Sequence, residues 1–142
     1  MTTLREVPPD KILSTAFSLI RDAKTEILAT MDFKEELAQP LPEEYFLLLK
    51  QKVFNGIILK RLGFGTKNEY TKFATKKPLA SKNYFLIHAK NDDYQRMLMV
   101  DRNKMILAKN FKNQRKFFFS DDPKCIKKYL DYFNYYLKIK TL

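Results

Sequence analysis

The chain has 142 residues, of which 45% are hydrophobic and 14% aromatic, so it can bury a core and is not a disordered tail. One cysteine rules out an internal disulfide, no apolar run approaches the ~20 residues of a membrane helix, and the N-terminus lacks a secretion signal. These features predict a cytoplasmic protein with one domain over residues 1–142.

The net charge of +11 is spread unevenly along the chain. Residues 1–50 carry 6 Lys or Arg against 9 Asp or Glu, a net charge of −3, whereas residues 51–142 carry 21 against 7, a net charge of +14. A half of the chain that is this basic favours a polyanionic partner, with nucleic acid as the first candidate. The alternative is the solvated surface of a lysine-rich protein.

The first part of the chain alternates predicted helices and strands. Pro8-Pro9-Asp10 indicates a helix start with Asp10 as N-cap, and apolar residues at helical spacing continue to about Ala23. Next we expect a strand at 26–31, a polar loop at 34–42, a helix at 42–55 and a strand at 57–62. Gly63 and Gly65 then indicate a turn that needs positive φ, with a loop held close to a ligand as the alternative.

The second part contains more strands. We expect a short basic helix at 67–77, strands at 84–89, 97–100, 105–108 and 116–120, and a helix from about 123 to 139. Met97–Val100 and Met105–Ala108 are short and nearly continuous in apolar residues, which predicts a hairpin buried on both faces of a sheet. The polar residues 101–104 between them are typical of a tight turn.

The order of these elements predicts an α/β fold whose mixed, partly parallel sheet is flanked by helices. Two strand–helix–strand units come first and give parallel strands, and hairpins follow and give antiparallel ones. Cys125, in the last helix, is expected to be a packing residue, with a reactive thiol as the alternative.

The basic and aromatic stretch KNFKNQRKFFFS, residues 109–120, allows two interpretations. Cations interleaved with Phe are typical of single-strand nucleic-acid binders, in which the rings stack on bases. A run of three Phe in a strand more often faces a core, and core packing is the interpretation we favour.

The segments resemble, in their order and separation, half of a phospholipase D-like protein. DAKTEILATM, with Ala23, Glu26 and Ile27, resembles the family's helix-to-strand passage. NGIILKRL, from Gly56, resembles the family's second strand, and MLMVDRNKMILAKN resembles the core hairpin that carries its catalytic signature. That signature is H-x-K-x4-D followed by G-S-x-N. Its His attacks phosphorus, its Lys binds the phosphate, and two such motifs pair in one site.

The catalytic signature is altered in this chain. With Asp101 at the Asp position, Tyr94 stands at the His position and Arg96 at the Lys position. The G-S-x-N positions hold residues 108–111, which include Lys109 and Asn110. A phenol with a pKa near ~10 is a poor nucleophile at neutral pH, so the resemblance implies a catalytically inactive domain.

A literal H-x-K also occurs once, at His88-Ala89-Lys90. Seven residues after His88 stands Gln95, where the signature requires Asp, so we interpret His88 as a histidine of a buried strand. His88 and Lys90 remain the catalytic candidates if the chain is an enzyme.

The leading hypothesis is therefore an inactive phospholipase D-like domain that binds an anionic or phosphate-bearing ligand, with nucleic acid as a candidate partner. The expected ligand-binding residues are Tyr94, Arg96, Asp101, Lys109 and Asn110, with no metal and no cofactor; the alternative for Arg96 is a structural pair with Asp101. One alternative function is a homodimeric phosphodiesterase or nuclease. Another is the ligand-sensing or dimerising module of a TrmB-type transcription regulator. The resemblance also implies a homodimer with the hairpins near its axis.

Overall fold

The computed structural model of the chain describes residues 4–89 and 93–141. Its strands form one mixed sheet in the order β1-β7-β6-β5-β2-β3-β4. The strands are β1 (Arg5–Val7), β2 (Glu26–Asp32), β3 (Ile58–Phe64), β4 (Tyr84–Ala89), β5 (Met97–Val100), β6 (Lys104–Phe111) and β7 (Gln114–Ser120). The helices are η1 (Pro9–Lys11), α1 (Ile12–Arg21), α2 (Phe33–Ala38), α3 (Glu43–Phe54), α4 (Lys67–Lys76) and α5 (Pro123–Thr141).

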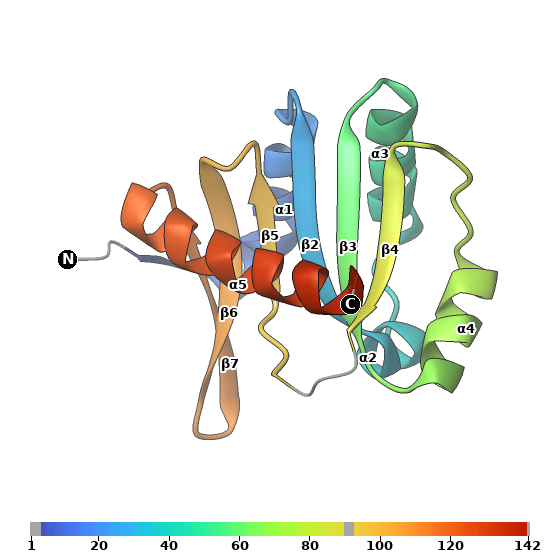
Figure 1. Cartoon of the computed structure of the whole chain (residues 1–142). Helices are drawn as coiled ribbons and strands as arrows, with labels where there is room; N and C mark the ends of the chain where they lie inside the picture. Colours follow the sequence, from blue (N-terminus) through green and yellow to red (C-terminus); the bar gives the residue numbers. More distant parts are fainter. Residues whose placement is uncertain (1–3, 90–92, 142) are drawn as a thin grey trace.

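The sheet is parallel on one side and antiparallel on the other, as the element order predicted. Strands β2, β3 and β4 run parallel, and the remaining pairs are antiparallel. Helix α5 crosses one face of the sheet, and α1 and α3 lie on the opposite face (Figure 1). Because neighbouring residues of a strand point to opposite faces, Ile27 packs in the core on the α1 and α3 side and Leu28 in the core under α5.

The β5–β6 hairpin lies in the interior of the sheet, and all of Met97–Val100 is buried, which confirms the prediction of a hairpin covered on both faces. Its turn has positive φ at Asp101 (53°) and Arg102 (56°), the backbone pattern of the tight turns that match strand twist. At its other end β6 continues past the apolar run. It pairs with β7 up to Phe111 and Gln114, in a ribbon that extends beyond the rest of the sheet (Figure 1).

Several sequence predictions were wrong in detail. Asp10 is not an N-cap, because η1 follows Pro8 without a side-chain cap and α1 begins only at Ile12. The expected polar loop contains α2, which starts where the Asp32 carboxylate accepts hydrogen bonds from the backbone N–H groups of Lys34 and Glu35. Strand β1 was not predicted, since a three-residue strand with one buried side chain has no periodicity to detect.

The two glycines after the second predicted strand have different roles. Gly63 lies inside β3, where the ring of Phe33 packs so closely that a Cβ atom would overlap it. Gly65 follows the strand and has a φ of +148°, so of the two glycines only Gly65 has the positive φ expected for the turn. Thr66 then caps α4 by accepting a hydrogen bond from the Glu69 backbone N–H.

The three consecutive Phe residues of β7 and the thiol of Cys125 pack as the sequence predicted. Phe117 and Phe119 are half-buried against the α1 side of the sheet, and Phe118 is half-buried against the α5 side. Cys125 is buried in α5, with 1% of its surface exposed. Among the described residues, no helix combines the length and apolar character needed to cross a membrane.

Candidate functional site

A polar pocket of about 280 Å³ lies where β5 begins and β6 ends. The same end of the sheet holds the carboxyl ends of the parallel strands β2 and β3, because β5 is antiparallel to β2 (Figure 1). Ligands of open α/β sheets commonly bind at this end. The residues that line the pocket are Tyr94, Gln95, Arg96, Ala108, Lys109, Asn110, Arg115 and Tyr129.

The start of β5 is held in place by side chains in addition to the backbone hydrogen bond that the Ala108 N–H donates to the Arg96 carbonyl oxygen (3.0 Å). The Gln95 amide group donates to the carbonyl oxygens of Arg96 (3.0 Å) and Ala108 (2.7 Å). The Thr30 hydroxyl donates to the Gln95 carbonyl and accepts from the Met97 backbone N–H (2.9 Å). These bonds fix the backbone on both sides of Arg96, so its side chain starts from a rigid position.

Cations outnumber acids around the pocket. Arg96, Lys109 and Arg115 line it, and the carboxylate of Glu35 from α2 stands between the two arginines. Arg115 Nη2 lies 2.7 Å from Glu35 Oε2, and Arg96 Nη1 lies 3.5 Å from Glu35 Oε1. The hydrogen bond from Arg115, helped by the charge of Arg96, holds the pKa of Glu35 below its ordinary value, so this group is anionic at neutral pH. The charge of Glu36 also acts on Arg96, so three cations face two anions and the pocket keeps a net positive charge.

Tyr94 is a poor replacement for a catalytic histidine. Burial raises the pKa of its phenol above the ordinary value, although the charge of Arg96 opposes this shift. The phenol accepts a hydrogen bond from Arg96 Nη1 (3.3 Å), and its ring lies 5.5 Å from that of Phe64. At neutral pH the hydroxyl keeps its proton and cannot act as a strong nucleophile.

Asp101 lies at the opposite end of β5 from the pocket. Its carboxylate accepts hydrogen bonds from the backbone N–H groups of Lys24 (2.9 Å), Thr25 (2.8 Å) and Glu26 (3.0 Å), and from the Thr25 hydroxyl. Burial alone would raise the pKa of Asp101, but these hydrogen bonds lower it overall. Asp101 therefore ties the hairpin turn to the start of β2. The pair between Arg96 and Asp101 is not formed, since Arg96 contacts Glu35 and Tyr94 instead.

His88 is buried on β4, and strands β3 and β2 lie between β4 and β5. One ring nitrogen, Nε2, lies 2.7 Å from the Gly65 carbonyl oxygen, and the ring stacks on Tyr70 with centroids 5.2 Å apart. His88 is not among the residues that line the pocket of Arg96. The second half of the literal motif, Lys90, lies outside the described residues.

The structure brings together Tyr94, Arg96, Lys109 and Asn110, and it adds residues that the sequence analysis missed. Arg115 belongs to the basic and aromatic stretch, so its charge was visible but its position opposite Asn110 was not. Glu35 lay in a segment expected to be a loop. Within the described part of the chain, no three His, Cys, Asp or Glu side chains are grouped as a metal site would require.

Solved structures with the same arrangement support the fold. NucT from Helicobacter pylori matches 97% of this chain and 96% of its own, with a TM-score of 0.61 and 17% identity. Nuc from Salmonella typhimurium, a phospholipase D family member, matches 97% of this chain and 94% of its own, with a TM-score of 0.62 and 12% identity. The chain has the phospholipase D-like fold.

A third similar structure relates this phospholipase D-like domain to TrmB-type proteins. TrmBL2, an archaeal chromatin protein, matches 96% of this chain with a TM-score of 0.64 and 17% identity, but only 52% of its own length is covered. No family model matches the sequence, and no curated protein matches it either. Sequence identities this low support the fold alone, so the function of the site has to be inferred from the residues of this chain.

Proposed function

We propose that residues 1–142 form one catalytically inactive phospholipase D-like domain that binds a phosphate-bearing ligand, with nucleic acid as the partner, in the pocket of Tyr94, Arg96, Lys109, Asn110 and Arg115. The observation that carries the proposal is the convergence of three cations on one polar pocket at the carboxyl ends of the parallel strands. The DNA binding named for the similar protein TrmBL2 supports this choice of ligand.

Each pocket residue has a part in the proposed binding. Arg96 and Arg115 offer planar guanidinium groups, which match two phosphate oxygens at once. Lys109 adds a point charge from the next strand, and the Asn110 amide adds a neutral donor. Glu35 pairs with both arginines in the absence of ligand, so a phosphate group has to displace the Glu35 carboxylate from them.

A charged surface alone attracts polyanions, so the test compares two matched losses of charge. A labelled single-stranded oligonucleotide is titrated at low salt into the wild type, into Arg96→Ala with Lys109→Ala, and into Arg21→Ala with Lys50→Ala. Arg21 and Lys50 are exposed residues of α1 and α3 and do not line the pocket. We expect the pocket pair to weaken binding about tenfold more than the control pair, because charge-assisted hydrogen bonds are lost. Equal weakening by both pairs would contradict a specific site and show that the oligonucleotide is attracted only by the positive charge of the surface.

Salt gives a second measure of the same contacts. Each phosphate contact that is lost should lower the slope of binding against salt by about 0.7 on a single strand. The variant Arg96→Ala with Lys109→Ala should therefore show a smaller dependence of binding on salt than the wild type. A ligand held by apolar contacts would give a slope near zero.

The enzyme alternative is tested by hydrolysis of a generic phosphodiester without added metal. We expect no activity above that of Tyr94→Phe, since the phenol stays protonated and Lys109 stands where the resembled family has Ser. Activity that persists through repurification and disappears in His88→Ala would show that His88 is catalytic and that the domain is an enzyme.

A further inference from the structure

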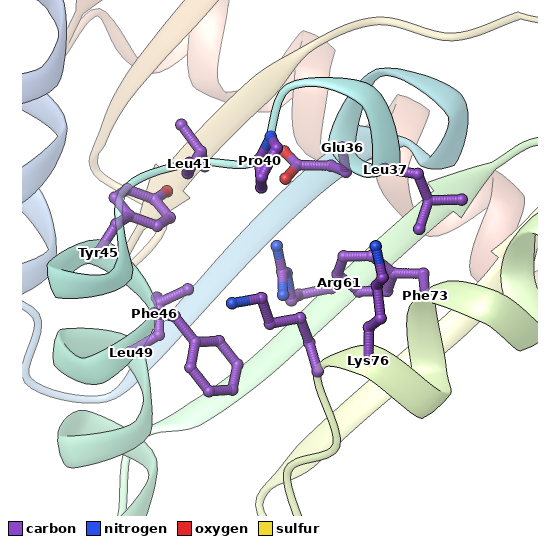
Figure 2. Close-up of a pocket in the computed structure, with 11 residues that line it drawn as sticks. Glu36, Leu37, Pro40, Leu41, Tyr45, Phe46, Leu49, Arg61, Phe73 and Lys76 are labelled. Atoms are coloured by element: carbon purple, nitrogen blue, oxygen red, sulfur yellow. The ribbon is translucent and has the colours of Figure 1, made fainter.

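A second cavity, of about 310 Å³, opens on the α1 and α3 side of the sheet between α2, α3, β3 and α4 (Figure 2). Its walls are largely apolar and come from Leu37, Leu41, Phe46, Leu49 and Phe73. Cavities of this size and character are typical of sites for small organic molecules. None of the residues that form the pocket of Arg96 lines this cavity, although Arg96 and Arg61 both line a smaller pocket of about 90 Å³ that adjoins it.

The centre of the cavity holds a buried arginine. Arg61 on β3 has only 6% of its surface exposed, and its guanidinium reaches into the hollow between the helices (Figure 2). Its Nε is buried with no hydrogen-bond partner, and within the described residues Arg61 forms no ion pair. Its guanidinium carbon lies 5.3 Å from the centre of the Phe73 ring. An unpaired buried cation is costly, so this group is suited to an acceptor that arrives from outside.

The other charges of the cavity are also mainly positive. The Lys76 amino group extends toward the same hollow, which the carboxylate of Glu36 enters from the opposite wall (Figure 2). Lys77 lines the cavity while its Nζ lies 3.2 Å from Glu43. Because Lys77 is paired with Glu43, Arg61 and Lys76 stand against Glu36, and the cavity favours a ligand with a negative charge.

We propose that this cavity binds a small organic carboxylate with an apolar body. The carboxylate pairs with the guanidinium of Arg61, whose planar donors match two carboxylate oxygens. The apolar body packs against Leu41, Phe46 and Leu49 and removes their surface from water. The apolar walls are the reason for an organic anion rather than a bare inorganic one. The inference does not depend on phosphate binding at Arg96.

The test uses octanoate and phenylacetate as probes in calorimetric titrations of the full chain. Acetate has the charge without the apolar body, and octanamide has the apolar body without the charge. We expect both probes to bind and both analogues to bind at least about tenfold more weakly. Arg61→Met should weaken octanoate binding about tenfold to a hundredfold, the range for loss of charge-assisted hydrogen bonds. Lys60→Met, the neighbouring residue of β3 on the other face of the sheet, should leave it unchanged.

Two further variants keep the result clear if Arg61→Met fails to fold. Leu41→Trp fills the cavity without changing its charge and should weaken octanoate binding, while far-ultraviolet circular dichroism verifies the fold. Lys109→Ala with Arg115→Ala should leave octanoate binding intact, because neither residue lines this cavity or the pocket that adjoins Arg61, so a failed phosphate site and a failed carboxylate site are distinguishable. Failure of both probes to bind, unchanged binding in Arg61→Met, or acetate binding as tightly as octanoate would overturn the proposal.

Discussion

At the scale of single residues, Glu35 controls how much positive charge the candidate site offers. Its carboxylate lies between Arg96 and Arg115, and each arginine that pairs with it is less available to a ligand. Glu35 is held by its ion pairs with these two arginines, so a neutral side chain at this position should change the charge of the site without changing the fold.

Glu35→Gln should raise the affinity for an oligonucleotide about two- to fivefold, because the pocket gains one net positive charge and the arginines lose a competitor. The matched control is Glu44→Gln, which removes one negative charge from the exposed first turn of α3. The measurement is the same low-salt titration. An equal gain in both variants would show that only the total charge matters.

Asp101 has a structural role that can be tested through pH. Asp101→Asn should lower the free energy of unfolding at pH 7 by about 1–3 kcal/mol, since the carboxylate accepts three backbone N–H groups at the start of β2. The folded pKa of Asp101 is below its ordinary value of 3.8, so its contribution is complete above that value and is lost as pH falls through the lowered pKa.

Denaturant titrations between pH 7 and pH 2 measure this difference. The gap between wild type and Asp101→Asn should close at acidic pH, because protonation removes the same charge. Asp10→Asn is the control, as Asp10 makes no cap bond to η1. A gap that stays constant down to pH 2 would contradict the role of the carboxylate charge.

At the scale of elements, the contact between β3 and α2 determines where the site's acidic residues lie. The Phe33 ring packs directly over Gly63, and Phe33 opens the helix that carries Glu35 and Glu36. Phe33 is fully buried, and its ring also lies 5.6 Å from that of Phe73 on α4. A glycine in the strand therefore positions a helix.

Gly63→Ala should cost about 1–3 kcal/mol of unfolding free energy or more, because the added methyl group overlaps the Phe33 ring. Gly56→Ala is the contrast, since Gly56 has open space around it and φ of +97°, so only backbone strain of about 1–2 kcal/mol is expected. Combining Gly63→Ala with Phe33→Leu should give a favourable coupling energy in denaturant titrations. Simple additivity of the two changes would show that the ring does not hold the helix.

At the scale of the whole molecule, we expect a homodimer with the β5–β6 hairpins near the axis. The β6–β7 ribbon, which continues from strand β6 of this hairpin, carries Phe111, and 46% of the surface of Phe111 is exposed. Light scattering at tens of micromolar should give about twice the chain mass of 16.9 kDa.

Phe111→Asp should shift this mass toward the monomer if the ribbon is part of the interface. Phe54→Asp is the control, because Phe54 is 63% exposed at the end of α3, away from the ribbon. A wild-type mass near 16.9 kDa would exclude the dimer at this concentration.

Much of the fold followed from the sequence because strong hydrophobic patterns dictate strands and helices locally. Tyr84–Ala89 and Met97–Val100 are observed at the predicted bounds, and the buried central hairpin followed from two apolar runs with a polar turn between them. Residues with weak local signals were missed. Helix α2 has six residues and depends on a cap from Asp32, and β1 depends on pairing with β7, which is remote in sequence.

The sequence by itself determined the fold class and the presence of Tyr94, Arg96, Lys109 and Asn110 near one hairpin. Only the tertiary structure decided which other groups join them, since Glu35 and Arg115 are brought there by the packing of α2 and the register of β6 with β7. Only the tertiary structure separated Asp101 and His88 from that pocket and exposed the cavity of Arg61. The physical reason is that spacing along a chain defines neighbours within an element, whereas a site is assembled across elements by long-range packing.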